Sequence, residues 1–312
     1  MKNKKMLGNG LLLLTALIWG TAFVFQRVGM GTISPITFNA ARMAVSAAVL
    51  APVALILRRR DKTSAKRTAE EQKRRDLNTL AGGLLCGCFT AVASIFQQIG
   101  LVYTSAGKAG FITAMYILLV PVIGFIFLKK KNTWLAWVAV LLGVLGMYLL
   151  SVSEGFKIAP GDALVLLCAF FYSFQILSCD RFAGDADPVG MSAIQFAVAT
   201  AVSVTVAFVA EKPSAAQIAA AWLPIVYCGL LSGCLGYTLQ IVGQKFTDPT
   251  SASLLMSLES VFAVVAGAIF IGERMTPREI VGCAVMFAAV ILVQTPLPKR
   301  KKHGEDGDGQ KE

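Results

Sequence analysis

Long apolar runs follow one another along the chain, and they limit what it can fold into more than any other feature. A helix of about twenty apolar residues crosses the hydrocarbon core of a bilayer, which is ~30 Å thick. Inside that core the backbone must satisfy its own hydrogen bonds, so a single segment crosses it as a helix. The runs lie at residues 8–26, 36–57, 78–99, 106–128, 133–152, 161–179, 189–210, 221–241, 251–271 and 278–296. The sequence therefore predicts an all-α polytopic membrane protein with ten transmembrane helices.

The composition agrees with this class. Of the 312 residues, 56% are hydrophobic and 15% are charged, whereas charged residues make up about 25% of an ordinary soluble domain. The first run imitates a signal peptide, but no convincing small-residue cleavage site follows it, so we interpret it as a retained first span. The seven cysteines lie in or beside apolar runs without zinc-site spacing, which indicates packing residues.

Lysine and arginine are distributed unevenly between the predicted loops. Most lie in the N-terminal segment, the charged loop at 58–76, the loop at 129–131 and the tail from residue 298. With ten spans these segments share one side of the membrane, and excess positive charge marks the cytoplasmic side. We therefore expect both termini in the cytoplasm of a multi-pass protein of the bacterial plasma membrane. The net charge of +11 does not indicate a nucleic-acid partner, because no basic face is interleaved with aromatic residues.

The chain also repeats itself. At an offset of 153, the matches are Gly8 with Gly161, Trp19 with Tyr172, Pro35 with Pro188 and Arg42 with Gln195. At an offset of 146, residues 83–88 match 229–234, and each segment has two glycines four apart, which let helices approach closely. The second copy begins after five spans, so the copies are expected in opposite orientations, as in many secondary carriers. The predicted units are residues 1–152, residues 153–297 and a basic polar tail, 298–312.

Short motifs recur in a fixed order along the spans. They are Ala16–Gly20, Pro35 with Arg42, Phe111–Ala114 with Val120–Pro121, Ser257–Phe262 and Gly272–Arg274. Together they resemble the EamA-domain family of the drug/metabolite transporter superfamily over residues 8–296. The resemblance implies two inverted five-span repeats, a central cavity and movement of small metabolites or drugs.

Two segments depart from the family pattern. Residues 129–131 are lysines where the family usually has Gly-Glu, which weakens any role that needs a symmetric pair of acids. The usual Glu-Pro of the ninth span is Glu259-Ser260 here. Because a proline kink is missing, we expect the ninth span to be straighter than in relatives.

Two charged residues inside spans are the strongest functional candidates. Glu259 either titrates a proton or pairs with a cationic substrate, or else it is a structural acid bonded to a neighbouring helix. Arg42 either binds a substrate carboxylate through its bidentate fork, or reaches the membrane interface or a helix end.

Uncharged side chains inside the spans complete the expected substrate site. Aromatic residues can form cavity walls or stack on a cationic group, although most such residues simply pack. Amides and hydroxyls can line a polar cavity or join helices. The aromatic candidates are Trp19, Tyr116, Tyr172 and Tyr237, and the polar candidates are Gln98, Thr113, Gln195 and Gln240, with Asn39, Gln175 and Gln244 also in or beside spans.

The motifs argue against an enzyme and against a primary pump. The sequence has no catalytic histidine, zinc motif, phosphate-binding glycine loop or G-x-S-x-G. We therefore expect no cofactor and no metal. The favoured interpretation is a secondary carrier that exports amino acids, related metabolites or cationic drugs by alternating access, with the proton as candidate coupling ion. A passive channel or a non-transporting membrane scaffold is the alternative. The expected partners are a small-molecule substrate and the lipid bilayer, and a homodimer stays open.

Overall fold

The computed structural model describes residues 2–61, 67–104, 106–130, 132–151, 160–270 and 276–294. Within these ranges every regular element is a helix, and no strand occurs. The elements are α1 (Lys2–Gly29), α2 (Pro35–Arg60), α3 (Ala69–Tyr103), α4 (Ala106–Thr113), α5 (Tyr116–Leu128), α6 (Trp134–Ser151), α7 (Pro160–Ala183), α8 (Pro188–Ala210), α9 (Ala215–Ala220), α10 (Trp222–Tyr227), the π-helix η2 (Cys228–Gly236), α11 (Tyr237–Gln244), α12 (Pro249–Met256), α13 (Glu259–Phe270) and α14 (Pro277–Gln294). The predicted tail at 298–312 and the Gly272–Arg274 motif lie outside the described residues.

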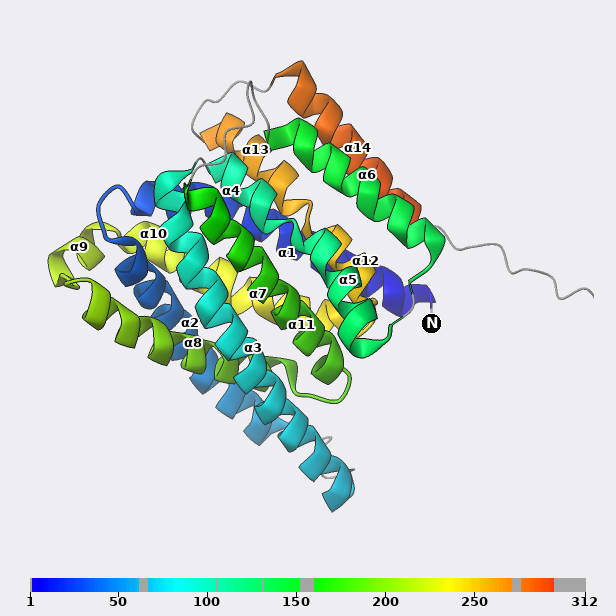
Figure 1. Cartoon of the computed structure of the whole chain (residues 1–312). Coiled ribbons are helices and arrows are strands. Elements are labelled where there is room, and N and C mark those ends of the chain that lie inside the picture. Colours follow the sequence, from blue (N-terminus) through cyan, green and yellow to red (C-terminus); the bar gives the residue numbers. More distant parts are fainter. Residues whose placement is uncertain are drawn as a thin grey trace, which may run out of the picture.

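Eight described segments are long and apolar enough to cross a membrane, judged by length and composition alone. They are Asn3–Gly29, Pro35–Arg60, Ala69–Tyr103, Lys108–Leu128, Pro160–Ala183, Pro188–Ala210, Trp222–Gln244 and Pro249–Phe270. The predicted spans 133–152 and 278–296 coincide with two shorter apolar helices, Trp134–Leu149 and Ile280–Val293. These are parts of α6 and α14, which lie side by side (Figure 1). The prediction of an all-helical membrane protein is confirmed for the described residues.

Local sequence explains where several helices begin. Proline stands in the first turn of α2 at Pro35, of α8 at Pro188 and of α12 at Pro249. It suits this position because the first N–H groups of a helix have no intrahelical acceptor. The carboxylates of Asp187 and Asp248 precede α8 and α12, and each accepts a hydrogen bond from the backbone N–H three residues on. These caps fix the entry of each chain segment into the bundle.

The fourth and ninth predicted spans are each interrupted near the middle. α4 ends at Thr113 and α5 begins at Tyr116, while α12 ends at Met256 and α13 begins at Glu259. At the second interruption, the Ser257 hydroxyl donates to the carbonyl oxygen three residues earlier, and such bonds compete with the helical ladder. The ninth span is therefore interrupted at residues 257–258, although it lacks the proline of the family pattern. That it is straighter than in relatives stays a prediction.

Glycines mark close crossings between helices that are far apart in sequence. Where α1 crosses α11, a Cβ added to Gly8 would lie 2.9 Å from the carbonyl oxygen of Gly243. Where α7 crosses α3, a Cβ added to Gly161 would lie 2.6 Å from the carbonyl oxygen of Gly100. Any side chain at these positions would push two backbones apart. The first members of the two pairs are separated by the predicted repeat offset of 153, so corresponding residues make both crossings.

A second pair of contacts corrects the predicted register of the repeat. A Cβ on Gly87 of α3 would meet Val198 of α8, and a Cβ on Gly229 of η2 would meet Val45 of α2. The two valines are again 153 residues apart, so Gly87 corresponds to Gly229. The predicted alignment at an offset of 146, which matched Gly83 with Gly229, is one helical turn out of register with these contacts.

The π-helix accounts for a remaining difference between the corresponding segments. One residue more separates Gly229 from Gly243 than separates Gly87 from Gly100. The π-helix Cys228–Gly236 lies within the longer segment. A single π-turn accommodates an additional residue inside an otherwise α-helical segment, and such turns are frequent at functional sites.

Candidate functional site

A buried cavity lies at the centre of the helices. Its walls come from α1, α2, α3, α4, α5, α7, η2, α11 and α13. The lining residues are Trp19, Phe23, Gln26, Arg42, Gln97, Thr113, Tyr116, Tyr172, Gln175, Ile176, Ser232, Tyr237 and Glu259. The cavity volume is about 30 Å³, which is room for one or two water molecules. A metabolite can enter only if the surrounding helices move apart.

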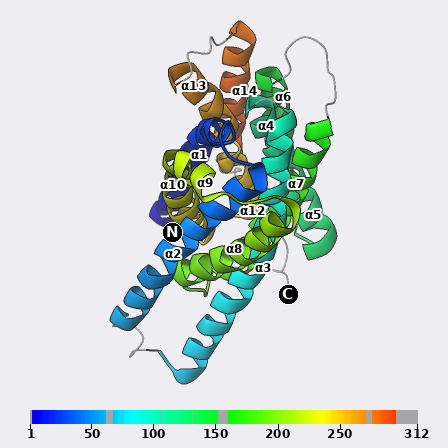
Figure 2. The same cartoon turned by 90° about the vertical axis from the view of Figure 1, so that its left-hand side faces the viewer.

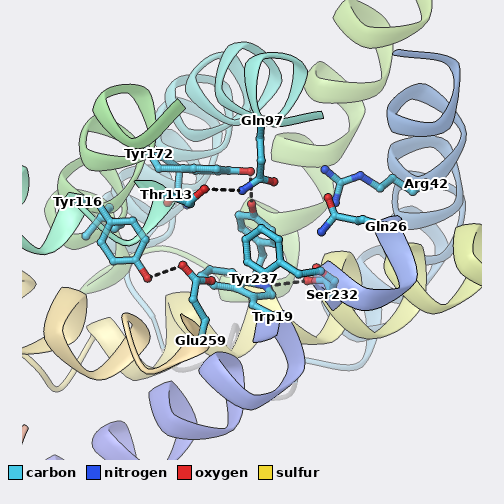
Figure 3. Close-up of a pocket in the computed structure, with 13 residues that line it drawn as sticks. Trp19, Gln26, Arg42, Gln97, Thr113, Tyr116, Tyr172, Ser232, Tyr237 and Glu259 are labelled. Carbon is cyan, nitrogen blue, oxygen red and sulfur yellow. Dashed lines mark hydrogen bonds between the residues drawn. The ribbon is translucent and has the colours of Figure 1, made fainter. Parts of the chain in front are cut away.

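The two helix interruptions meet at one side of this cavity. Glu259 is the first residue of α13, and Tyr116 is the first residue of α5. The Tyr116 hydroxyl donates a hydrogen bond of 2.9 Å to Glu259 Oε1 (Figure 3). Both side chains are buried. The interruption places Glu259 at a helix N-terminus inside the bundle, where the helix dipole favours negative charge.

Arg42 faces the cavity from another side. Its guanidinium donates through Nε and Nη2 to the side-chain oxygen of Asn39, at 3.1 and 2.9 Å. The Asn39 amide in turn donates to Ser94 and Ser203, each at 3.0 Å. Arg42 is 6% exposed, and no carboxylate within 4.0 Å pairs with it in the described part of the chain. A buried guanidinium held by a neutral amide retains the capacity to bind an anion.

Aromatic rings form the wall between Arg42 and Glu259. The rings of Trp19 and Tyr237 have centroids 4.8 Å apart, and the Tyr237 hydroxyl donates to the Tyr172 hydroxyl at 3.2 Å. Trp19 Nε1 donates to the carbonyl oxygen of Ser232 at 3.2 Å, in the π-helix. Figure 3 shows these rings turned toward the same space as Glu259 and Arg42. The wall thus offers flat faces for an apolar or aromatic group beside the Arg42 guanidinium and the Glu259 carboxyl group.

Most of the candidates named from the sequence line the cavity. They are Trp19, Arg42, Thr113, Tyr116, Tyr172, Tyr237 and Glu259, with Gln175. Five of the polar residues named do not line it: Asn39, Gln98, Gln195, Gln240 and Gln244. Gln195 donates to Thr90 at 3.0 Å, and Gln240 exchanges two hydrogen bonds with Gln175 at 3.2 and 3.1 Å. The polar side-chain atoms of Gln98 are buried without a hydrogen-bond partner among the described residues.

Five lining residues were not predicted from the sequence. They are Phe23, Gln26, Gln97, Ile176 and Ser232. Helical spacing could have found two of them, because residues four and seven positions after Trp19 lie on its face of α1. Gln97 donates to Thr113 at 3.2 Å, a contact with no signal in the local sequence. No group of three or more His, Cys, Asp or Glu side chains suited to a metal occurs in the part of the chain that the structure describes.

Comparison with known proteins identifies the family of this chain. The model of the EamA-like transporter family matches the chain twice, at residues 6–152 and 159–295. The chain therefore belongs to the EamA-like transporter family, as its motifs predicted. It is a multi-pass membrane protein of the drug/metabolite transporter type.

Individual relatives agree with this assignment. A protein of Archaeoglobus fulgidus named "Uncharacterized transporter" is 28% identical over 290 residues, covering 90% of this chain and 84% of that protein. A protein of Streptantibioticus cattleyicolor named "Probable terminal-alkyne amino-acid exporter" is 24% identical and covers 95% of this chain and 96% of its own length. A solved crystal structure shares the fold, with a TM-score of 0.70 at 17% identity over 91% of this chain and 95% of that one.

Proposed function

We propose that the protein is a secondary carrier that exports a small amino-acid-like zwitterion across the plasma membrane by alternating access. The observation that carries the proposal is that a guanidinium and a carboxyl group, those of Arg42 and Glu259, line one buried cavity. A substrate carboxylate matches the guanidinium, which lacks an anionic partner among the described residues, and a substrate ammonium matches Glu259. A cationic drug would use Glu259 alone and leave Arg42 buried without an anion. The amino-acid exporter name of one relative supports the same substrate class and direction.

The proposed architecture is two inverted repeats of five helices, at residues 1–152 and 153–297, with both termini in the cytoplasm. Corresponding helices begin at constant offsets: α4, α5 and α6 each precede α12, α13 and α14 by 143 residues, and α2 precedes α8 by 153. The packing of α3 against α7 and of α1 against α11 supports the same pairing. An odd number of spans per copy inverts the second copy. The loop and tail lysines and arginines support the orientation.

Proton coupling is proposed to act through Glu259. In the structure, whose cavity is too small for a metabolite and which we call the closed form, the Glu259 carboxyl group accepts a hydrogen bond from Tyr116. A proton and a substrate ammonium compete for the same carboxyl group, because either one neutralises its charge. When the site faces the outside, a proton that binds Glu259 therefore displaces the substrate ammonium, and the substrate leaves. When the site faces the cytoplasm, a substrate that binds Glu259 displaces the proton. This competition exchanges one proton inward for one zwitterion outward.

The test is flux in proteoliposomes with an imposed pH gradient, using pooled amino acids and organic cations. We expect saturable, gradient-driven flux of amino acids, which Glu259→Gln abolishes at normal membrane abundance. Arg42→Lys should raise the KM for amino acids about tenfold or more, because a bidentate charged contact is lost. Arg59→Lys is the matched control, since Arg59 is exposed and outside the cavity.

Other outcomes would replace the proposal. Flux that does not saturate would favour a passive channel. Absence of flux from folded, inserted protein would favour a scaffold or a cargo of another class. Full activity in Glu259→Gln would exclude the proposed coupling, and unchanged KM in Arg42→Lys would exclude carboxylate recognition.

A further inference from the structure

A second, larger cleft lies apart from the central cavity. Its volume is about 740 Å³, and it is bounded by the C-terminal part of α2, the N-terminal part of α3 and the N-terminal part of α8. Figure 2 shows the end of α2 and the start of α3 projecting beyond the other helices, with α8 between them. None of the described residues that line it also lines the central cavity.

One end of the cleft is apolar and open, because alanine side chains of α2 and α8 line it. Ala51 and Ala54 of α2 lie three residues apart, and Ala193 and Ala197 of α8 lie four apart, so each pair occupies one helix face. Leucine or phenylalanine at these positions would fill the space. Both helices are long and apolar enough to cross a membrane. An acyl chain can fill an apolar cleft between two such helices, because water would find too few polar partners there.

The other end of the cleft carries balanced charge. Three arginines and three aspartates line it in pairs: Arg58 with Asp76 at 3.0 Å, Arg67 with Asp61 at 2.8 Å, and Arg75 with Asp187 at 3.7 Å. Their side chains are partly exposed in every pair. The separation of 3.7 Å is longer than that of a direct charge-assisted hydrogen bond. Both signs of charge can therefore also reach a ligand at this end.

We propose that this cleft binds one phospholipid whose head group carries an ammonium, such as phosphatidylethanolamine. One acyl chain lies between the alanine faces of α2 and α8. The phosphate accepts hydrogen bonds from Arg75 and Arg58, and the ammonium donates to Asp76. An amphiphile matches the sharp change from apolar to charged lining. A zwitterionic head group matches the equal numbers of arginines and aspartates, whereas an anionic lipid would leave the aspartates facing negative charge.

The site lies between three helices of the proposed transport unit. Because the lipid would contact α2, α3 and α8 together, its binding stabilises the arrangement in which they are seen. The binding measurement does not require transport, so failure of the proposed function leaves this test intact.

The experiment is native mass spectrometry of the full-length protein, purified in detergent and titrated with phosphatidylethanolamine, phosphatidylglycerol or phosphatidylcholine of identical acyl chains. We expect one phosphatidylethanolamine to bind about fivefold or more tightly than phosphatidylglycerol, the difference made by one charge-assisted hydrogen bond. Ala193→Phe should abolish the preference by filling the apolar end. Ala201→Phe is the matched control, since Ala201 lies two turns further along α8 on the exposed surface and outside the cleft lining.

A charge variant tests the head group separately. Asp76→Asn leaves the lining with an excess of arginine, so it should shift the preference toward phosphatidylglycerol, while the unfolding temperature stays close to that of the unaltered protein. Equal binding of all three lipids, or a preference that survives Ala193→Phe, would overturn the proposal in favour of ordinary surface lipid. A preference for phosphatidylglycerol in the unaltered protein would overturn the zwitterionic assignment.

Discussion

Replacing Tyr116 with phenylalanine tests whether one hydrogen bond holds the cavity closed. The substitution removes only the hydroxyl that donates to Glu259 Oε1 at 2.9 Å. Tyr116 is 2% exposed and Glu259 3% exposed, so only a water confined in the central cavity can replace the lost donor. Leaving a buried acceptor unsatisfied costs about 1–3 kcal/mol. That cost falls on the closed form alone if α5 and α13 separate on opening, and it corresponds to an increase of about 5- to 150-fold in the open population.

The assay is the rate at which Cys168 reacts with a small thiol reagent, read by peptide mass spectrometry. Cys168 is fully buried, so it reacts only when the helices around it separate. We expect faster labelling by the factor above and a lower unfolding temperature. Tyr103→Phe is the matched control, because Tyr103 is 60% exposed and lies outside the cavity lining. If the two variants label at the same rate and unfold at the same temperature, the bond does not hold the cavity closed.

Three further predictions concern stability, each measured by thermal unfolding in detergent. Gly20→Ala should destabilise the protein by about 1–3 kcal/mol, because its Cβ would lie 2.6 Å from the carbonyl oxygen of Glu259; Gly10→Ala, with nothing within 4 Å, should not, and equal effects would contradict the packing argument. Asp162→Asn should destabilise the protein by about 1–3 kcal/mol, because it leaves the Lys108 ammonium beside a neutral amide. The two side chains are 2.5 Å apart, and that of Lys108 is 27% exposed. An unchanged unfolding temperature would mean that solvent screens the pair. Gln240→Leu should destabilise the protein by about 1–3 kcal/mol, because the buried amide of Gln175 loses its hydrogen-bond partner. Leucine at both Gln240 and Gln175 should recover most of that stability. A double variant less stable than the single one would contradict the idea that the two amides satisfy each other's hydrogen bonds.

Local sequence sufficed for the all-helical membrane class and for most of the cavity lining. Apolar runs of membrane length leave few alternatives to helices, because hydrocarbon offers the backbone no hydrogen-bond partners. A charged residue inside such a run is costly, so Glu259 and Arg42 stood out without any structure. Both line the cavity in the structure. The repeat offset of 153 could also be found from the sequence, because it requires only a comparison of residue types along the chain.

The tertiary structure decided the features that depend on contacts between distant segments. The offset of 146 joined the wrong glycines because residue types recur every helical turn, and only the packing of Gly87 and Gly229 against valines of other helices selects the register. The helix interruptions at residues 114–115 and 257–258 bring Tyr116 to Glu259, 143 residues away. The periodicity of apolar residues cannot predict a hydrogen bond between residues so far apart, because it indicates only which face of a helix a residue occupies. Sequence therefore determined what could enter the membrane, whereas packing determined which side chains meet inside it.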